Sequence, residues 1–187
     1  EASFVAPAGI GTLTGNDVVV DLVSQSSTLP AWWDLFNAGA CRQASLSMNW
    51  VIPSANNNCV DYWGGNAGGG LTSYRTFTTN NPTPAPNRAR IIGAAGLADA
   101  NTGAITANSN VFMFSLTLDG LGTPSCAGCP TPAALVLNQI TLGLQDGSQV
   151  RVTGGAPCIS ANTASAGLCG ATATRNATWG QVKALYR

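Results

Sequence analysis

The chain has 187 residues, of which 45% are apolar, so it is long enough and apolar enough to fill one core. Charged residues make up only 9%, with eight basic residues balancing eight acidic ones. Because no excess of positive charge is present to hold phosphates, nucleic acids and anionic membrane surfaces are excluded as expected partners. The polar surface must come from Asn, Thr, Ser, Gln and Gly, and such a weakly charged surface tolerates contact with copies of itself.

Short β-strands separated by polar, glycine-rich loops are predicted in the first part of the chain. Residues 17–23 are the first clear strand, and residues 30–36 predict one or two helical turns. Residues 45–52 alternate apolar with polar side chains, and residues 58–63 predict a partner strand for them. The glycine-rich stretch 64–70 predicts a loop.

Two more strands are predicted in the middle of the chain. Residues 80–87 contain three prolines and predict an extended loop, which leads into a short strand at 88–94. Residues 110–119 give the strongest signal for a half-buried strand. Their alternation places four apolar side chains on one face: Phe112, Phe114, Leu116 and Leu118.

A β-bulge is predicted within the strand that begins at residue 134. Leu135 and Leu137 share one phase of the alternation, whereas Ile140 and the leucines after it share the other. The phase changes near Asn138-Gln139, which is the pattern of one extra residue in a strand.

The same strand is predicted to continue into a hairpin around Asp146-Gly147. A two-residue turn would oppose Leu142 to Arg151, whereas a three-residue loop at 145–147 would oppose Leu142 to Val150. The longer loop also sets Ile140 against Val152 and keeps one face apolar. We therefore predict the three-residue loop, with Gly147 in the left-handed conformation.

The chain is predicted to end in a short helix. Thr178-Trp-Gly-Gln181 is a capping box, and apolar side chains follow it at helical spacing. We expect residues 179–186 to dock as a helix on the body. With no internal repeat and no charged linker, residues 1–187 are predicted to form one domain, an all-β antiparallel β-sandwich stapled by disulfides.

Six cysteines fall in sequence as three local pairs. Six cysteines allow 15 connectivities, so spacing alone leaves the pattern open. We predict that each bond ties a local loop, which gives Cys41–Cys59, Cys126–Cys129 and Cys158–Cys169. Because disulfides persist in oxidising compartments, the protein is expected outside the cell or at its surface. The sequence shows no signal peptide and no apolar run that could span a bilayer, so a mature product or a fragment is expected.

The residue types needed for most enzyme mechanisms are scarce. The chain has no histidine, which excludes Ser-His-Asp and Cys-His catalysis and His-ligated zinc, and its one glutamate is Glu1. A glycosidase-like pair of aspartates is the remaining enzymatic alternative, and no two aspartates stand out by spacing. We expect no catalysis, no cofactor and no metal.

The Cys126-Ala-Gly-Cys129 motif admits three interpretations. A redox dithiol would favour a helix N-terminus, whereas this motif lies among Gly, Pro and Ser between two predicted strands. A zinc site would need Cys158 and Cys169 as a second pair, and their spacing is unlike that of zinc knuckles. A small disulfide loop is the preferred interpretation.

Aromatic residues are the candidates for ligand binding. Trp50 alternates with core residues, and Trp179 lies on the predicted helix, so both are interpreted as structural. Of the neighbours Trp32 and Trp33, we expect at most one to be buried. A glycan-binding surface would use exposed rings for stacking, here Trp32, Trp33, Tyr62 and Trp63. Asn176-Ala-Thr178 also fits the acceptor pattern for N-glycosylation.

Several strings together resemble a group of secreted, largely metagenomic bacterial proteins of unknown function. The strings are Leu29-Pro-Ala-Trp-Trp-Asp34, Cys41-Arg-Gln43, Cys59-Val-Asp-Tyr-Trp63, Ser125-Cys-Ala-Gly-Cys129 and the ending Thr178-Trp-Gly-Gln-Val-Lys-Ala-Leu-Tyr-Arg187. The resemblance implies an extracellular β-protein with no assigned activity and no catalytic residues. Members usually carry an additional N-terminal stretch with its own cysteines, which this sequence lacks.

The missing stretch motivates an assembly hypothesis. A sandwich without one edge strand leaves backbone groups that a neighbouring chain's extended segment can pair. Residues 1–15 carry no charge after Glu1 and are predicted to be such a donor, with apolar contacts from Phe4, Val5, Ile10 and Leu13. The expected function is a non-catalytic subunit of an extracellular bacterial filament or surface layer, with copies of itself as partner. The alternative is a carbohydrate-binding or adhesin module.

Overall fold

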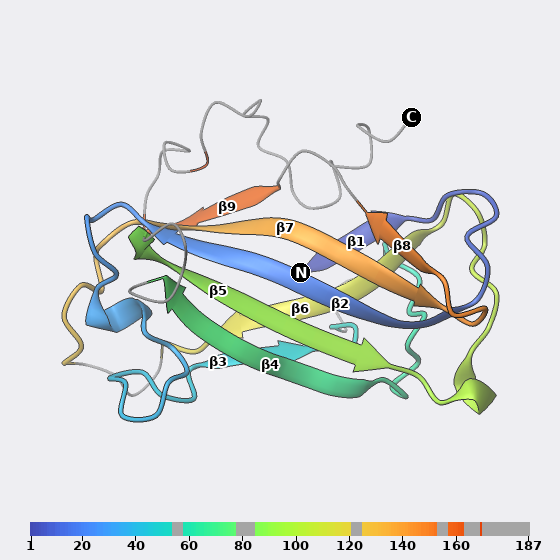
Figure 1. The fold of residues 1–187 in the computed structure, drawn as a ribbon, viewed down its shortest axis with the longest axis horizontal. Helices are drawn as coiled ribbons and strands as arrows, with labels where there is room; N and C mark the ends of the chain where they lie inside the picture. Colours follow the sequence, from blue (N-terminus) through green and yellow to red (C-terminus); the bar gives the residue numbers. More distant parts are fainter. Residues whose placement is uncertain (54–57, 78–84, 121–124, 153–156, 163–168, 170–187) are drawn as a thin grey trace.

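The fold is described from a computed structural model (Figure 1). The described residues are 1–53, 58–77, 85–120, 125–152, 157–162 and 169. The predicted helix at 179–186, Trp179 and the acceptor Asn176 lie outside these residues. Within them, the regular secondary structure consists of β-strands and two single 3-10 turns, which confirms the all-β prediction.

The larger sheet has β2 and β7 at its centre. β2 (Leu13–Ser24) pairs antiparallel with β5 (Ala85–Gly96) on one side and with β7 (Ala133–Leu144) on the other. β4 (Gly68–Phe77) forms one edge. At the other edge, β7 pairs with two short strands in turn, β9 (Cys158–Ala161) along its first part and β8 (Gln149–Val152) along its last part.

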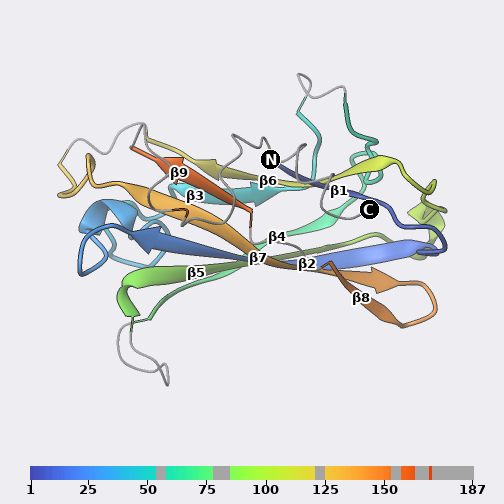
Figure 2. The ribbon, with the colours of Figure 1, turned by 90° about the horizontal axis from the view of Figure 1, so that it is seen from above.

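The smaller sheet has three strands in the order β1-β6-β3. β6 (Asn110–Leu118) is its centre, flanked by β1 (Ala2–Val5) and β3 (Leu46–Asn49), and both pairings are antiparallel. Figure 2 shows the two sheets in separate layers, with β1, β3 and β6 on one side and β2, β4, β5 and β7 on the other.

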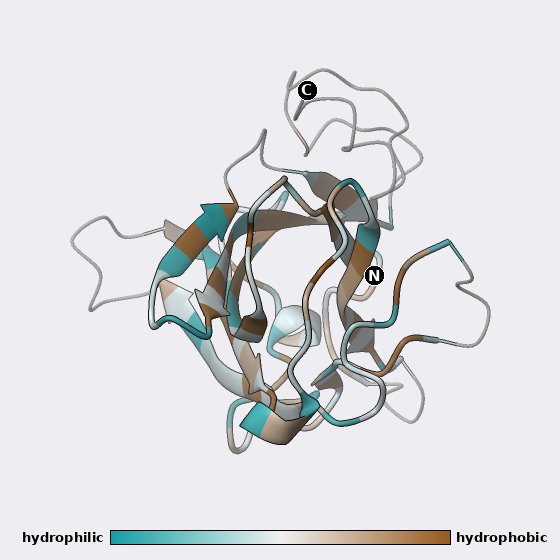
Figure 3. Ribbon diagram, turned by 90° about the vertical axis from the view of Figure 1, so that its right-hand side faces the viewer, coloured by the Kyte–Doolittle hydropathy of each residue, from teal (hydrophilic) through white to brown (hydrophobic). Residues whose placement is uncertain are grey.

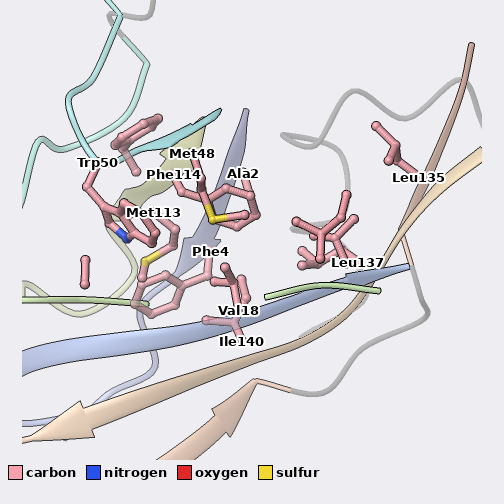
Figure 4. Packing of buried hydrophobic residues seen from close by; sticks show 14 of the residues in the cluster. Ala2, Phe4, Val18, Met48, Trp50, Met113, Phe114, Leu135, Leu137 and Ile140 are labelled. Carbon is pink, nitrogen blue, oxygen red and sulfur yellow. The ribbon is translucent and has the colours of Figure 1, made fainter. Parts of the chain in front are cut away.

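The core consists of the side chains that alternate inward from both sheets. In β2, Val18, Val20 and Leu22 are buried. Asp17, which comes just before them in the alternation, is exposed. Figure 3 shows this alternation as brown and teal segments along the strand ribbons. Figure 4 shows where the layers meet, with Phe4 of β1 among side chains of β2 and β6.

The strands predicted at 17–23 and 88–94 are confirmed as β2 and β5, and both are longer than predicted. They pair with each other over nine residues, from Gly15↔Gly96 to Val23↔Arg88. The strand at 45–52 is confirmed only over β3, with Leu46, Met48 and Trp50 buried on one face. The helical turn predicted at 30–36 is a single 3-10 turn, η1 (Ala31–Trp33).

The hairpin prediction is confirmed in register. Leu142 pairs with Val150 and Ile140 with Val152, and Gly147 has φ +82°. The bulge is confirmed as well, since Val19 pairs with Gln139 and Val20 with Leu137, which leaves one residue between them unpaired.

The strand predicted at 110–119 is confirmed as β6, and its four predicted apolar side chains all contact the core, but its alternation is interrupted at Met113. The register shifts between Ala2↔Phe114 and Ser3↔Phe112, so Met113 is an extra residue in β6. This irregularity turns Phe112, Met113 and Phe114 all into the core. Leu116 and Leu118, which follow it, are only partly buried.

Two predictions around residue 65 are wrong. Residues 58–63 form no strand, since only Val60 makes an isolated bridge, to Val111. In this segment Trp63 is buried and Val60 is exposed. The predicted loop at 64–70 instead runs into β4, which begins at Gly68.

Candidate functional site

The N-terminal segment that was predicted to donate a strand is paired with the chain's own β6. Phe4 and Ile10 are buried to 6% and 5% exposure, and Leu13 is fully buried, whereas Val5 is half-buried. Backbone bonds between Ala6 and the turn at 108–109 extend the pairing of β1. In this structure the segment is therefore part of its own core rather than a free arm.

The connection between β1 and β2, residues 6–12, contains two exposed glycines in the left-handed region. Gly9 has φ +74° and Gly11 has φ +78°, and no heavy atom lies within 4 Å of a Cβ built on either. The loop borders an open cleft of about 610 Å³ shared with the β7–β8 turn, lined by Gly9, Ile10, Gly11, Thr12, Leu144, Gln145, Asp146, Ser148 and Val150. The two glycines are therefore open to solvent, whereas Ala6 and Ile10 of the same connection are buried in the core.

Two of the four candidate binding aromatics are buried. Trp33 is 2% exposed and donates its indole N–H to the Thr131 carbonyl at 3.1 Å. Trp63 is 1% exposed and donates to the Phe112 carbonyl at 3.1 Å. Both rings therefore serve the core, and Trp63 packs edge-on against Tyr62.

The other two aromatics are partly buried and make internal contacts. The Tyr62 hydroxyl bonds the Leu13 carbonyl at 2.6 Å and the Gly103 carbonyl at 2.7 Å. The Trp32 ring is covered by the guanidinium of Arg42, 4.0 Å from its centroid. The prediction that at most one of Trp32 and Trp33 is buried is confirmed, and the structure does not gather the four aromatics into one exposed platform.

The disulfide predictions are confirmed for one pair and wrong for the others. Cys158 and Cys169 are bonded as predicted. Cys41 is bonded to Cys126, with a Cα–Cα distance of 5.8 Å, so the predicted bonds Cys41–Cys59 and Cys126–Cys129 are both absent. Cys59 and Cys129 are free thiols, the first partly buried and the second exposed. Local spacing misled the prediction because the fold brings together chain segments 85 residues apart.

Arg42, next to Cys41, is a buried cation that the sequence analysis did not single out. It is 2% exposed, and it donates to the Trp32 carbonyl at 3.2 Å and to the Asp119 carbonyl. Burial lowers the pKa of its guanidinium, and the nearby Cys129 and Asp119 act in the opposite direction. Only its presence within the Cys41-Arg-Gln43 string could have drawn attention to it.

The aspartates, which were the enzymatic alternative, have separate local partners. Asp21 forms an ion pair with Arg90 at 2.8 Å. Asp34 accepts from the Asn37 amide, Asp61 from the Gly64 N–H, and Asp146 from Ser148 in its own turn. Within the described residues, no group of three or more Cys, Asp or Glu side chains is arranged to hold a metal ion.

No protein-family model, curated protein or solved structure matches this chain. In the described part of the chain, no helix is both long and apolar enough to cross a membrane. Functional inference therefore depends on three features described above: the edge strand β1 with its glycine-containing connection, the internally occupied aromatics, and the cysteine cluster around Arg42.

Proposed function

We propose that this protein is a non-catalytic structural subunit of an extracellular bacterial filament or surface layer. Its two sheets form a disulfide-stapled β-sandwich, and copies are joined by exchange of β1. The observation that carries the proposal is the position of β1, a four-residue edge strand whose Phe4 fills the core and whose connection to β2 contains two exposed glycines.

Exchange of β1 preserves the contacts that it makes within one chain. The pairing of Ser3 with Phe112 and of Val5 with Asn110 is the same whether β1 belongs to that subunit or to its neighbour. Such swapping is a low-cost route to association when a connecting loop can extend. Gly9 and Gly11, which have open space around them, supply a loop able to do so.

β1 also pairs with only part of β6. On the side where β1 lies, the register ends at Ala2↔Phe114. Among the described residues no strand pairs with β6 on that side beyond Phe114, next to residues 115–118. A short strand at a partly open edge is a favourable starting point for pairing between chains.

The outcome of exchange is an open assembly rather than a closed pair if each subunit gives its strand to the next. A head-to-tail contact of this kind closes only when its rotation permits, and otherwise it builds a fibre. The balanced and sparse charge of the chain opposes stacking of copies only weakly. The two disulfides suit an oxidising, extracellular setting.

The test combines particle size with a covalent trap for β1. Purified protein is examined by electron microscopy and by light scattering on a size-exclusion column. In a Cys59→Ser background, Val5→Cys with Asn110→Cys places two thiols at directly opposed positions, where cross-strand Cβ atoms lie about 4.5–5.5 Å apart. Val5→Cys alone is the matched control.

Exchange predicts fibres whose subunits run as a covalent ladder on a non-reducing gel, but only in the double variant. If fibres form but the engineered disulfide lies within single chains, the structural role is supported and exchange of β1 is excluded. A particle that stays at 19 kDa under all conditions would overturn the assembly proposal. In that case, a change of Trp fluorescence on adding polysaccharide would favour the carbohydrate-binding alternative.

A further inference from the structure

A disulfide and a free thiol lie at one end of the sheets, where η1 and residues 125–132, which lead into β7, meet at the left of Figure 1. The Trp32 N–H donates to the Ala127 carbonyl at 2.9 Å, and the Cys41–Cys126 disulfide joins the same two segments. Cys129 follows Cys126 by three residues and is a free, exposed thiol. A disulfide and a thiol therefore share one short stretch of chain.

The turn that carries Cys129 keeps it close to Cys126. Residues 127–130 form a turn, and the Thr131 N–H donates to the Gly128 carbonyl at 3.0 Å. Gly128 has φ +92°, and a Cβ there would lie 2.3 Å from Cβ of Pro30, so the turn requires glycine. Cys129 therefore lies in a turn that begins one residue after Cys126, and the two cysteines have the Cys-X-X-Cys spacing that a disulfide can bridge.

A fixed positive charge lies beside these sulfur atoms. The guanidinium of Arg42 is held between the Trp32 ring and the Asp119 carbonyl, and Cys129 is near enough to influence it electrostatically. In thiol–disulfide exchange, both the attacking and the departing sulfur carry negative charge, so a neighbouring cation favours the reaction.

We propose that Cys129 is an exchange thiol for the Cys41–Cys126 disulfide. The Cys129 thiolate attacks Sγ of Cys126, a Cys126–Cys129 bond forms, and the bond to Cys41 breaks. The electron pair leaves on Sγ of Cys41, which takes up a proton in place of the one that Cys129 lost. The step is an isomerisation with no net oxidation, so it needs no added oxidant or reductant.

The two isomers differ in what ties this end of the fold together. In the first, a covalent bond links η1 and the segment before β3 to the β6–β7 connection. In the second, that link is replaced by a four-residue loop, and the segments are held by noncovalent contacts, among them the hydrogen bonds of Trp32 to Ala127, Trp33 to Thr131 and Arg42 to Asp119. Exchange therefore makes this end of the subunit a two-state element. The inference is independent of assembly through β1.

The experiment maps the disulfides of the full chain without added thiol. Protein is held at several pH values between about 6 and 9, because the thiolate and not the thiol is the attacking species in exchange. It is then quenched with acid, and free thiols are alkylated before digestion and mass spectrometry. We expect both isomers, with an approach to equilibrium that is at least tenfold faster at the highest pH and independent of protein concentration. Cys129→Ser should retain only Cys41–Cys126, and Cys59→Ser, the matched control, should behave as the wild type.

Three results would overturn the proposal. One is a single pairing at every pH, whichever pairing it is. Another is isomerisation that accelerates with protein concentration, since it would be intermolecular. The third is isomerisation that persists in Cys129→Ser and in Cys129→Ala, the second variant, which guards against an effect of the serine hydroxyl.

Discussion

The indole N–H of Trp50 donates to Oδ1 of Asn16 across 2.8 Å, inside the core and between the two sheets. Trp50 follows β3 of the smaller sheet, and Asn16 lies in β2 at the centre of the larger one. Both side chains are buried, and Nδ2 of Asn16 has no partner in the structure. This contact therefore resists separation of the two layers, because a buried donor and acceptor are costly to separate.

Trp50→Phe should destabilise the protein through loss of that contact and through the smaller ring that it leaves in the core. The substitution leaves Oδ1 of Asn16 buried without a donor, which costs about 1–3 kcal/mol in the free energy of unfolding. Urea unfolding followed by circular dichroism measures the difference. Val51→Ala, at the exposed neighbouring position, is the control and should change stability by less than about 0.5 kcal/mol. Equal midpoints for the two variants would show that the hydrogen bond contributes nothing.

Gly93→Ala tests how tightly the two layers pack. A Cβ at Gly93 would lie 2.1 Å from Sδ of Met48 and 3.1 Å from Cη2 of Trp50. Overpacking of this kind costs about 1–3 kcal/mol. Gly70→Ala, at a strand position with nothing within 4 Å of the new Cβ, is the matched control and should be neutral or better. Adding Met48→Val to Gly93→Ala should recover part of the loss in thermal melts. A neutral Gly93→Ala would mean that the layers separate easily.

Arg42→Lys should be far from conservative. The guanidinium bonds two carbonyls, of Trp32 and Asp119, while it stacks on the Trp32 ring, and an ammonium group cannot reproduce that planar arrangement. We expect a loss of about 2–3 kcal/mol, in line with charge-assisted hydrogen bonds of about 1.5–3 kcal/mol each. Arg75→Lys on the exposed face of β4 is the control. Denaturant midpoints that agree between the two variants would contradict this role.

Features set by neighbouring residues could be predicted from the sequence. The bulge before Gln139 and the loop closed by Gly147 follow from a change of phase and a residue suited to positive φ, and both are confirmed. β4 escaped prediction because its glycines are typical of a loop. The fold requires small residues there, since a Cβ at Gly69 would lie 2.2 Å from the Ala94 carbonyl oxygen.

Features set by distant segments could not be predicted in this way. The Cys41–Cys126 bond depends on two connections that meet only once both sheets have formed. Likewise, nothing local distinguishes Arg42, which is buried, from Arg75, which is exposed. The same limit applies to the N-terminal segment, because an apolar, uncharged stretch suits a donor arm and a core strand equally well.

Stability should fall at alkaline pH because of Tyr74. Its phenol is buried and donates to the Trp33 carbonyl, and this burial, together with the nearby Asp34, raises its pKa. An unfolded tyrosine titrates near about pH 10, so the folded state holds the proton more tightly. This contribution is complete below that pH and is lost as pH rises further. Tyr74→Phe should lower the free energy of unfolding by about 1–2 kcal/mol at pH 7. Above about pH 10, the free energy of unfolding of the variant should fall less steeply than that of the wild type in urea titrations. If the free energy of unfolding of the two proteins falls in parallel with pH, Tyr74 is not the cause of the alkaline loss of stability.

The two disulfides should differ in what they contribute, because they close loops of very different length. Cys41–Cys126 spans 85 residues and Cys158–Cys169 spans 11. In the chain-entropy description, the longer loop contributes about 4.5 kcal/mol and the shorter about 3 kcal/mol. In a Cys129→Ser background, which prevents new pairing with Cys126, Cys41→Ala with Cys126→Ala should therefore lower the urea midpoint more than Cys158→Ala with Cys169→Ala. Cys59→Ala controls for removal of a cysteine as such. The reverse order would show that the Cys41–Cys126 segments remain associated in the unfolded chain without the bond, since the entropic advantage of the longer loop would then be absent.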